Sequence, residues 1–331
     1  MEEINMMKPL DRPARPRALP SAKARRKRKA RAAEAAAGAK RKDWREIGLG
    51  YALLAPSLAL FSIFLFYPMV KSVYLSLHLT DPRGNVALFV GLDNYQAMFA
   101  SPAFYESLKV TMMFMLMTVP PAMIVALALA ALTCHKGAGM RLFQWIFSMP
   151  VIISVGTGSI IWMMLFHPSV GMLNYWLGLA GIDPIFWLAD PNWALLSVCI
   201  VTVWMNLGFV YIVMLGALKG IPPEIYESAK IDGAGAWRTF FRISIPLVSP
   251  SLFFVGIVSV VGAFQAFGQI NILTKGGPAQ ATDVIVYSIY QDAFVNFQFG
   301  TGSAKALVLF VIILILTVIQ FRLVERKVHY Q

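Results

Sequence analysis

Polar side chains inside apolar stretches are the residues of this sequence best suited to bind a ligand. Thr202 and Asn206 are four residues apart in one apolar stretch, and Gln265 and Gln269 are four apart in another. On a helix, residues at this spacing share one face. Trp204 lies in the first stretch but on a different face. Neutral hydrogen-bonding groups near an indole ring suit a sugar, whose hydroxyls need donors and acceptors and whose C–H faces stack on rings.

The same polar pairs have a second interpretation as contacts between membrane helices. Such interhelical hydrogen bonds contribute about 0.6 kcal/mol each in measured cases. A substrate pathway and interhelical contacts therefore both remain open for these residues. The small residues Ser154, Gly156 and Gly158 predict close helix packing rather than a pathway.

No group of residues in the sequence has the spacing of a catalytic or metal site. The four histidines are far apart, at His78, His135, His167 and His329. The sequence also lacks a Gly-x-x-x-x-Gly-Lys phosphate loop, so the chain does not hydrolyse ATP by that route. We therefore expect no enzymatic activity, no cofactor and no metal in this chain. Any energy from ATP must come from a separate subunit.

The composition indicates an integral membrane protein. Of the residues, 58% are hydrophobic and 14% are charged, whereas about 25% are charged in a typical soluble domain. Apolar runs of about twenty residues recur, which is the length needed to cross about 30 Å of hydrocarbon. Since backbone amides in lipid must be paired within the segment, these runs predict helices. Six spans are predicted, at 48–77, 108–133, 142–166, 194–218, 249–273 and 303–323.

The net charge of +12 is concentrated at the N-terminus. Residues 1–46 hold 15 of the 29 Lys and Arg and 6 of the 17 acids. They lack apolar periodicity, so we expect a disordered basic tail that fixes the topology and touches anionic lipid headgroups, not a nucleic-acid-binding arm. In the predicted topology, nine of the basic residues outside the tail lie on the same side of the membrane as the tail, and five lie on the opposite side. This asymmetry predicts that both termini are cytoplasmic.

The predicted outer loop at 167–193 contains no Lys or Arg. It carries two acids and several aromatic residues: Asp183, Asp190, Tyr175, Trp176, Phe186, Trp187 and Trp193. Aromatic side chains gather where a membrane meets water. The loop is therefore either an interfacial aromatic belt or a docking surface for an external partner.

The predicted inner loop at 219–248 is too polar to cross a bilayer. Consecutive prolines from Pro222 predict a helix start, because the missing amide hydrogens have no helical partner there. Gly233 then permits a sharp turn, with Asp232 as a cap for a second short helix that Pro246 ends. This helix–turn–helix must lie at the inner membrane surface. It is either a connector packed on its own bundle or a surface for a cytoplasmic partner.

This inner loop resembles the signature loop of binding-protein-dependent ABC importer permeases. That pattern is Glu-Ala-Ala, a Gly four residues on, and Ile-x-Leu-Pro about ten residues later. Here it is filled by Glu227-Ser228-Ala229, Gly233 and Ile243-Ser244-Ile245-Pro246, with Ser228 and Ile245 as departures. The resemblance implies an all-α integral membrane protein with the six-helix type I importer permease fold and a coupling helix seated on an ATPase. The residues expected in ATPase coupling are Glu224, Glu227, Ser228, Ala229, Asp232, Gly233 and Ala234.

Further segments resemble particular branches of this family. The stretches at 89–95, 262–265, 276–278 and 320–322 resemble the maltose-type sugar branch, so the resemblance covers residues 48–331. The stretches at 81–84, 280–282 and 324–331 are similar to the glycerol-3-phosphate permease subgroup. Because the predicted spans hold no Arg or Lys near the midplane to meet a phosphate dianion, we expect carbohydrate import, with sn-glycerol-3-phosphate as the alternative.

The resemblance also implies an assembly in the bacterial cytoplasmic (inner) membrane. Residues 47–331 would form the permease domain. Its partners would be a second, different permease subunit, two cytoplasmic ABC ATPase subunits and an extracytoplasmic solute-binding protein, all around the lipid bilayer. The rival from another class is a non-transporting membrane scaffold or receptor whose inner loop docks a cytoplasmic protein.

Overall fold

The computed structural model describes residues 44–135, 137 and 139–324. Nearly all of the predicted basic tail, and the last residues of the chain, lie outside these ranges. The chain divides after Tyr67 into two units, which are described separately. In the first unit, α2 (Trp44–Phe61) leads into a π-helical segment, η1 (Ser62–Phe66). The helix that contains these segments is long and apolar enough from Gly48 to Ser76 to cross a membrane.

The second unit begins with the remainder of α3 (Tyr67–Ser76) and contains the other apolar helices. Three of them are long enough to span: α5 (Pro102–Thr133), α9 (Pro191–Lys219) and α16 (Phe299–Val324). Two further spans are bent pairs. In the described residues this gives four spanning helices, or six if each bent pair counts as one span, which agrees with the predicted number.

In the first bent pair, the chain bends by 105° at a short break between the two helical segments. It consists of α6 (Met140–Ser148) with the 3-10 segment η2 (Met149–Ile152), followed by α7 (Val155–Leu165). Ser154 caps α7 by accepting a hydrogen bond from the Thr157 amide at 3.2 Å. A Cβ added to Gly158 would lie 2.7 Å from Cε of Met205. The predicted close packing is therefore confirmed at Gly158.

The second bent pair corrects the predicted fifth span at 249–273. Its helical path starts earlier, at Ala236, with α11 (Ala236–Thr239), η3 (Phe240–Ser244) and α12 (Ile245–Leu247). After a bend of 67°, α13 (Ser249–Phe264) follows and ends well before residue 273. A separate short helix, α14 (Gly268–Leu273), packs against α7. Gly268 permits this contact, because a Cβ there would lie 2.9 Å from Cγ1 of Val155.

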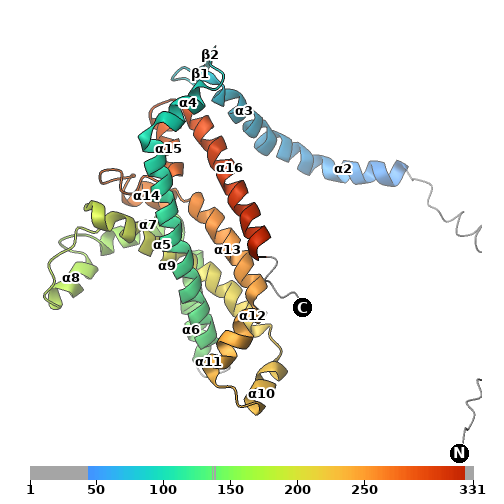
Figure 1. Ribbon diagram of the computed structural model, residues 1–331, viewed down its shortest axis with the longest axis vertical. Helices are drawn as coiled ribbons and strands as arrows, with labels where there is room; N and C mark the ends of the chain where they lie inside the picture. Colours follow the sequence, from blue (N-terminus) through green and yellow to red (C-terminus); the bar gives the residue numbers. More distant parts are fainter. Residues whose placement is uncertain (1–43, 136, 138, 325–331) are drawn as a thin grey trace, which may run out of the picture. The chain divides into compact units, whose positions relative to one another are not determined.

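Helices α5 and α9 pack side by side and form the centre of the second unit (Figure 1). The α5 face in this contact carries small residues four apart. Thr118, Ala122, Ala126 and Ala130 are all no more than 2% exposed. Small residues allow helix backbones to approach closely where no water drives the association. On α9, Val210, Tyr211 and Met214 are buried in the same cluster as Ala126 and Ala130.

A β-hairpin and short helices close one end of the second unit (Figure 1). Strands β1 (His78–Thr80) and β2 (Val86–Phe89) pair antiparallel, and α4 (Asp93–Ala100) follows them. Asn94 fastens α4 by donating from Nδ2 to the carbonyls of Ser76 and His78 at 2.9 and 3.1 Å. Near this end, α15 (Ile285–Tyr290) and the π-helical η4 (Gln291–Val295) precede α16. We call this the hairpin end.

The turn of this hairpin is closed by one carboxylate. Asp81 accepts hydrogen bonds from the backbone and the side chain of Asn85, at 2.7 and 3.1 Å, and from the Arg83 amide at 3.0 Å. The bond from the Asn85 side chain is the main reason that the pKa of Asp81 lies below its usual value. Gly84 completes the turn with a φ of 82°, where a side chain would be strained.

Replacing Ala126 by Leu tests the α5–α9 contact. The larger side chain overfills a fully buried position, so we expect Ala126→Leu to lower the free energy of unfolding by about 1–3 kcal/mol. Ala128→Leu is the matched control, because Ala128 is exposed on the same helix. Denaturant-induced unfolding in mixed micelles measures both variants. Equal stability of the two variants would contradict the proposed role of the contact.

Candidate functional site

The candidate site is the connection from α9 to α13, which includes a short helix, α10 (Pro223–Ile231). Pro222 occupies the N-cap of α10, as the consecutive prolines predicted. Glu224 lies in its first turn and Lys230 in its last turn, where the helix dipole favours each charge. Residues 219–248 thus form a helix–turn–helix whose first helix is confirmed where the sequence predicted it.

The turn after α10 depends on Gly233. Its φ is +72°, in the left-handed region that glycine adopts without strain. The Gly233 amide donates to the Lys230 carbonyl at 3.1 Å, and the Ala234 amide donates to the Ala229 carbonyl at 2.9 Å. These bonds satisfy carbonyls that a helix end would leave unpaired.

Two details of the predicted loop were wrong. Asp232 was expected to cap the second helix, but it is the C-cap of α10, and Gly235 occupies the N-cap of α11 without a side-chain bond. Pro246 was expected to end the second helix, but α12 continues through it to Leu247. Pro246 lies just after the π-helical η3, within the helical path that continues from Ala236.

Most of the residues expected in coupling are exposed on one surface of this loop. Exposed are Glu224, Glu227, Ser228, Asp232 and Gly233, whereas Ala234 is half-buried. Ala229 is only 5% exposed, so its side chain packs inward and does not contribute to the exposed surface.

Sequence reasoning missed the apolar part of this surface. Ile231 is 86% exposed and Trp237 is 78% exposed, although both are large apolar residues. The Trp237 ring stacks on Phe241, with centroids 5.8 Å apart and planes 9° from parallel. Exposed apolar residues beside acidic ones are typical of a surface that binds another protein. The signal in the sequence was an aromatic pair four residues apart in a polar loop.

The inward face of α10 is anchored on the helix bundle. Ile225 and Tyr226 pack against the buried cluster formed by residues such as Leu218 and Val248. The Tyr226 hydroxyl lies 3.2 Å from Oγ of Ser244 in η3, within hydrogen-bonding distance. A displacement of α10 would therefore be transmitted to both α9 and the start of the α11–α13 span.

A second set of hydrogen bonds joins the start of this loop to two other helices. Lys219, the last residue of α9, donates to Oε1 of Gln144 in α6 at 3.0 Å. Gln144 in turn donates from Nε2 to the Thr133 carbonyl at the end of α5, at 2.6 Å. The Thr133 hydroxyl is 2.6 Å from the hydroxyl of Tyr211 in α9. The ends of α5, α6 and α9 are thus held together beside the loop.

The residues considered for a substrate pathway do not all lie together. Thr202 is 3% exposed and accepts a hydrogen bond from Nε2 of Gln269 at 3.3 Å, so this pair joins α9 to α14. Asn206, one turn further along α9, is exposed. Trp204 is half-buried and contacts Trp162 edge-on, with ring centroids 5.8 Å apart. The geometry of Thr202 and Gln269 is that of an interhelical contact.

The expectation that Gln265 and Gln269 share a helix face was wrong. Gln265 is the C-cap of α13 and is exposed, whereas Gln269 belongs to α14 and is buried. The helical spacing argument requires one uninterrupted helix, and the chain breaks between the two residues.

An aromatic cluster near α14 was not predicted. Phe267 lies 4.9 Å from Tyr290 and 6.1 Å from Tyr287, between ring centroids. Tyr290 also contacts Phe294, at 5.8 Å. The spacing of Tyr287, Tyr290 and Phe294 along one helical path could have revealed it. Such rings can stack on the C–H face of a sugar as well as on one another.

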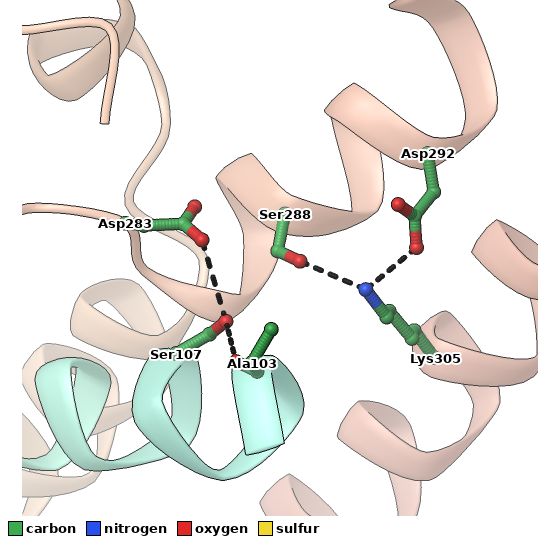
Figure 2. A network of polar contacts seen from close by, with 6 residues as sticks. All are labelled: Ala103, Ser107, Asp283, Ser288, Asp292 and Lys305. Atoms are coloured by element: carbon green, nitrogen blue, oxygen red, sulfur yellow. Dashed lines mark hydrogen bonds and ion pairs between the residues drawn. The ribbon is translucent and has the colours of Figure 1, made fainter. Parts of the chain in front are cut away.

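A network of charged and hydroxyl side chains joins the elements of the hairpin end (Figure 2). Lys305 of α16 is 8% exposed and points toward Ser288 and Asp292, with Nζ 2.9 Å from the Ser288 hydroxyl and 2.6 Å from Asp292 Oδ2. Beside this pair, the hydroxyl of Ser107 in α5 donates to Asp283 Oδ2 at 3.4 Å. The network links α5, the start of α15, η4 and α16.

Asp283 is the one carboxylate of this network without a cation in direct contact in the described part of the chain. Burial raises its pKa to about 6, partly offset by the charge of Lys305 and the hydrogen bond from Ser107, while the charge of Asp292 raises it further. Its Oδ1 is buried and has no hydrogen-bond partner among residues 44–135 and 139–324. The protonation state of Asp283 therefore affects how the hairpin end is held.

Known proteins are similar to this chain in sequence or in fold. A permease protein of a sn-glycerol-3-phosphate transport system, from Agrobacterium fabrum, is 37% identical over 85% of this chain and 96% of its own length. Two solved structures of a bacterial alginate ABC transporter are similar in fold. One, in complex with an alginate pentasaccharide-bound periplasmic protein, matches with a TM-score of 0.77 at 24% identity, covering 86% of this chain and 96% of that one. The other, described as importing the acidic polysaccharide alginate, matches with a TM-score of 0.75 at 26% identity, covering 86% and 98%.

The family model agrees with these matches and includes the candidate site. The model for the inner membrane component of binding-protein-dependent transport systems matches residues 135–330. That range contains α10, the Gly233 turn and the bent span that follows. Together with the relative that is 37% identical, this match shows that the chain belongs to the family of binding-protein-dependent transport system inner membrane components.

Proposed function

We propose that the chain is the permease subunit through which a carbohydrate enters the cell, driven by ATP hydrolysis on a separate subunit. The observation that carries this proposal is the surface formed by α10 and the Gly233 turn. It is exposed, acidic and apolar on one side, and packed onto the bundle on the other. As an ABC importer permease the chain is a transport subunit, not an enzyme.

The mechanism we infer is mechanical coupling through this surface. Glu227, Asp232 and the exposed apolar residues Ile231 and Trp237 would bind a groove of the ATPase. Closure of the ATPase dimer on ATP would then move α10 as a rigid piece. Tyr226 and the buried Ala229 would pass this movement to α9 and to the α11–α13 span, because both residues pack inward.

The partners follow from the same proposal. ABC importer permeases act with a second permease, ATPase subunits and a binding protein, and one structurally similar permease was solved with a periplasmic protein bound. For this chain we infer a heterodimer of permeases, two ATPase subunits and an extracytoplasmic solute-binding protein. The protein is a multi-pass component of the inner membrane, and the excess of basic residues near its N-terminus supports cytoplasmic termini.

For the solute, the uncharged side chains support a carbohydrate. Asn206 and Gln265 are exposed, so their amide groups would be free to form hydrogen bonds with the hydroxyls of a sugar in the pathway. The aromatic cluster around Phe267 and Tyr290 adds stacking surfaces. The buried Lys305 is already paired with Asp292 and so does not offer a free cation to an anionic solute.

One observation favours a second candidate solute, sn-glycerol 3-phosphate. The relative from Agrobacterium fabrum, which is 37% identical over nearly its full length, is named as a permease of a sn-glycerol-3-phosphate transport system. In this alternative the phosphate would be recognised by the binding protein or the partner permease. A scaffold or receptor role without transport finds no support in the family match.

Uptake by cells tests the proposed function. Cells with the whole transport system are compared with cells that lack only this chain, using radiolabelled maltotriose and radiolabelled sn-glycerol 3-phosphate. The proposal expects ATP-dependent maltotriose uptake that is lost with the chain. Loss of glycerol-3-phosphate uptake alone would support the alternative solute, and unchanged uptake of both would overturn both solute proposals.

Substitution of Gly233 tests the coupling surface. No atom lies within 4 Å of a Cβ added there, so any effect must come from the left-handed backbone and not from a clash. We expect Gly233→Val to reduce solute-stimulated ATP hydrolysis and uptake about 5- to 30-fold, since a strain of about 1–2 kcal/mol disfavours the native turn. The assay is run on the assembled complex.

Two control variants separate backbone strain from loss of the glycine itself. Gly233→Asn retains much of the activity in this interpretation, because Asn tolerates the left-handed region. Gly235→Ala does so as well, because Gly235 has an ordinary φ of −69° and a Cβ added there meets no atom within 4 Å. Full activity of Gly233→Val would remove the turn from the coupling mechanism.

The raised pKa of Asp283 predicts a pH-dependent stability. An acid whose pKa rises on folding, here from 3.8 to about 6, holds its proton more tightly in the folded state. Its contribution to stability therefore falls as pH rises from about 4 to about 6 and stays lost above that range. Asp283→Asn should raise the Tm of the purified complex more at pH 7.5 than at pH 4.5.

The control for this measurement is Asp183→Asn, which removes a carboxylate from an exposed loop position. A Tm difference for Asp283→Asn that is the same at both pH values would show that the buried carboxylate does not titrate in this range. A lower Tm at pH 7.5 would reverse the sign that we derive.

A further inference from the structure

The α8 helix (Met172–Leu179) lies at the periphery of the second unit (Figure 1). Met172, Tyr175, Trp176 and Leu179 follow one another at helical spacing on its exposed side. Together with the flanking apolar residues they are between 49% and 82% exposed: Val170, Met172, Tyr175, Trp176, Leu179 and Ile182. A contiguous apolar surface of this kind marks a site of interaction.

The polar side chain of α8 points inward instead. Asn174 is 6% exposed. Its Nδ2 donates to the carbonyls of Pro168 and Ile185 at 3.0 and 2.9 Å. Its Oδ1 accepts from the Ile185 amide at 3.1 Å and from Nε1 of Trp187 at 2.9 Å. This distribution is the reverse of that of a helix on a water-exposed surface, where the apolar face is turned inward.

The orientation of α8 is fixed by its connection to α7. Gly171 is buried, and a Cβ added to it would lie 2.3 Å from the His167 carbonyl oxygen and 2.5 Å from the Leu165 carbonyl oxygen. The Gly171 amide also donates to the His167 carbonyl at 2.9 Å. The exposed apolar face is thus held in a definite direction and is not a feature of a loose loop.

The charges of this segment indicate which surface it fits. Residues 167–193 contain no Lys or Arg, and α8 itself contains no charged residue. Asp183 is exposed in the following loop, and Asp190 caps α9 by accepting from the Asn192 amide at 2.9 Å. Such a segment has no electrostatic attraction to anionic lipids, which distinguishes it from basic amphipathic helices.

Three occupants are compatible with an apolar surface here: the bilayer, a soluble binding protein and the second permease subunit. A soluble partner leaves between transport cycles, so the exposed aromatic and aliphatic side chains would then face water. The bilayer is always present, and α8 joins α7 to α9, both of which belong to membrane spans. Tyr and Trp, here Tyr175 and Trp176, are also the residues preferred at the boundary between lipid and water.

We propose that α8 lies in the interface of the bilayer and anchors the α7–α9 connection through Met172, Tyr175, Trp176 and Leu179, in contact with electrically neutral lipid. Its function is to hold the start of α9 at a fixed depth. This proposal does not depend on the identity of the solute or on the coupling surface. It assigns the segment to lipid, and docking of the binding protein becomes an outcome of the test.

Site-directed spin labelling of the assembled importer in phosphatidylcholine liposomes tests the proposal. Nitroxide labels are attached to Trp176→Cys and, separately, to Leu179→Cys, in a background with Cys134→Ser and Cys199→Ser. Oxygen, which concentrates in lipid, should relax both labels severalfold more strongly than a water-soluble nickel chelate does. The matched control is Asp183→Cys in the same loop, where the nickel chelate should be the stronger relaxant.

Three results would overturn the proposal. Labels at 176 and 179 that neither oxygen nor the nickel chelate relaxes would assign the surface to the second permease subunit. The labels at 176 and 179 could be as accessible to the nickel chelate as the control label and become protected only when solute-loaded binding protein is added, which would assign the surface to that protein. Alternatively, oxygen could relax the labels more strongly than the nickel chelate only after phosphatidylglycerol replaces part of the lipid. That result would contradict a contact with electrically neutral lipid. If the label at 176 prevents assembly, the label at 179 on the same exposed face decides the question.

Discussion

The close contact between α5 and α9 is the interaction on which the rest of the second unit depends. In lipid the association of helices cannot rely on exclusion of water, so it requires backbones that approach closely. Ala122, Ala126 and Ala130 provide that approach along α5. The same helix holds the start of α15 at its other end, where the Thr111 hydroxyl accepts from the Ile285 amide at 2.9 Å. Helix α5 thus connects the hairpin end with the elements beside α10.

The bends in two spans follow from contacts with these central helices. A Cβ on Gly208 of α9 would lie 2.6 Å from the amide nitrogen of Val151, in the 3-10 segment where the α6–α7 span breaks. The absence of a side chain at Gly208 therefore allows the broken span to rest directly on α9. The second break, after α12, is at Val248, which is buried in the cluster that Ala126 of α5 forms with Tyr211 of α9. Both irregular segments are supported by protein, as backbone within a membrane requires.

Much of the fold could be predicted from the sequence, because the relevant signals are local. Hydropathy and length identify the spans, and the prolines at the start of α10 with Gly233 after it define the helix–turn–helix. The break between α13 and α14 could not be predicted, because it depends on the packing of Gly268 against a distant helix. For the same reason the pairing of Gln269 with Thr202 was not predicted. The four-residue spacing of small side chains on α5 is a further local signal, whereas close packing was predicted from the small residues of the third span.

The ion pair between Lys305 and Asp292 has a consequence for the biogenesis of the protein. A lysine in a membrane helix disfavours insertion by about 2.5–3.5 kcal/mol at the helix centre, and less near an end. Here the counter-ion is supplied by η4, the segment immediately before α16, and not by a helix made much earlier. The charge of Lys305 can be neutralised by the segment that leaves the translocon just before α16. Helix α16 can therefore enter the bilayer before it packs against the other helices.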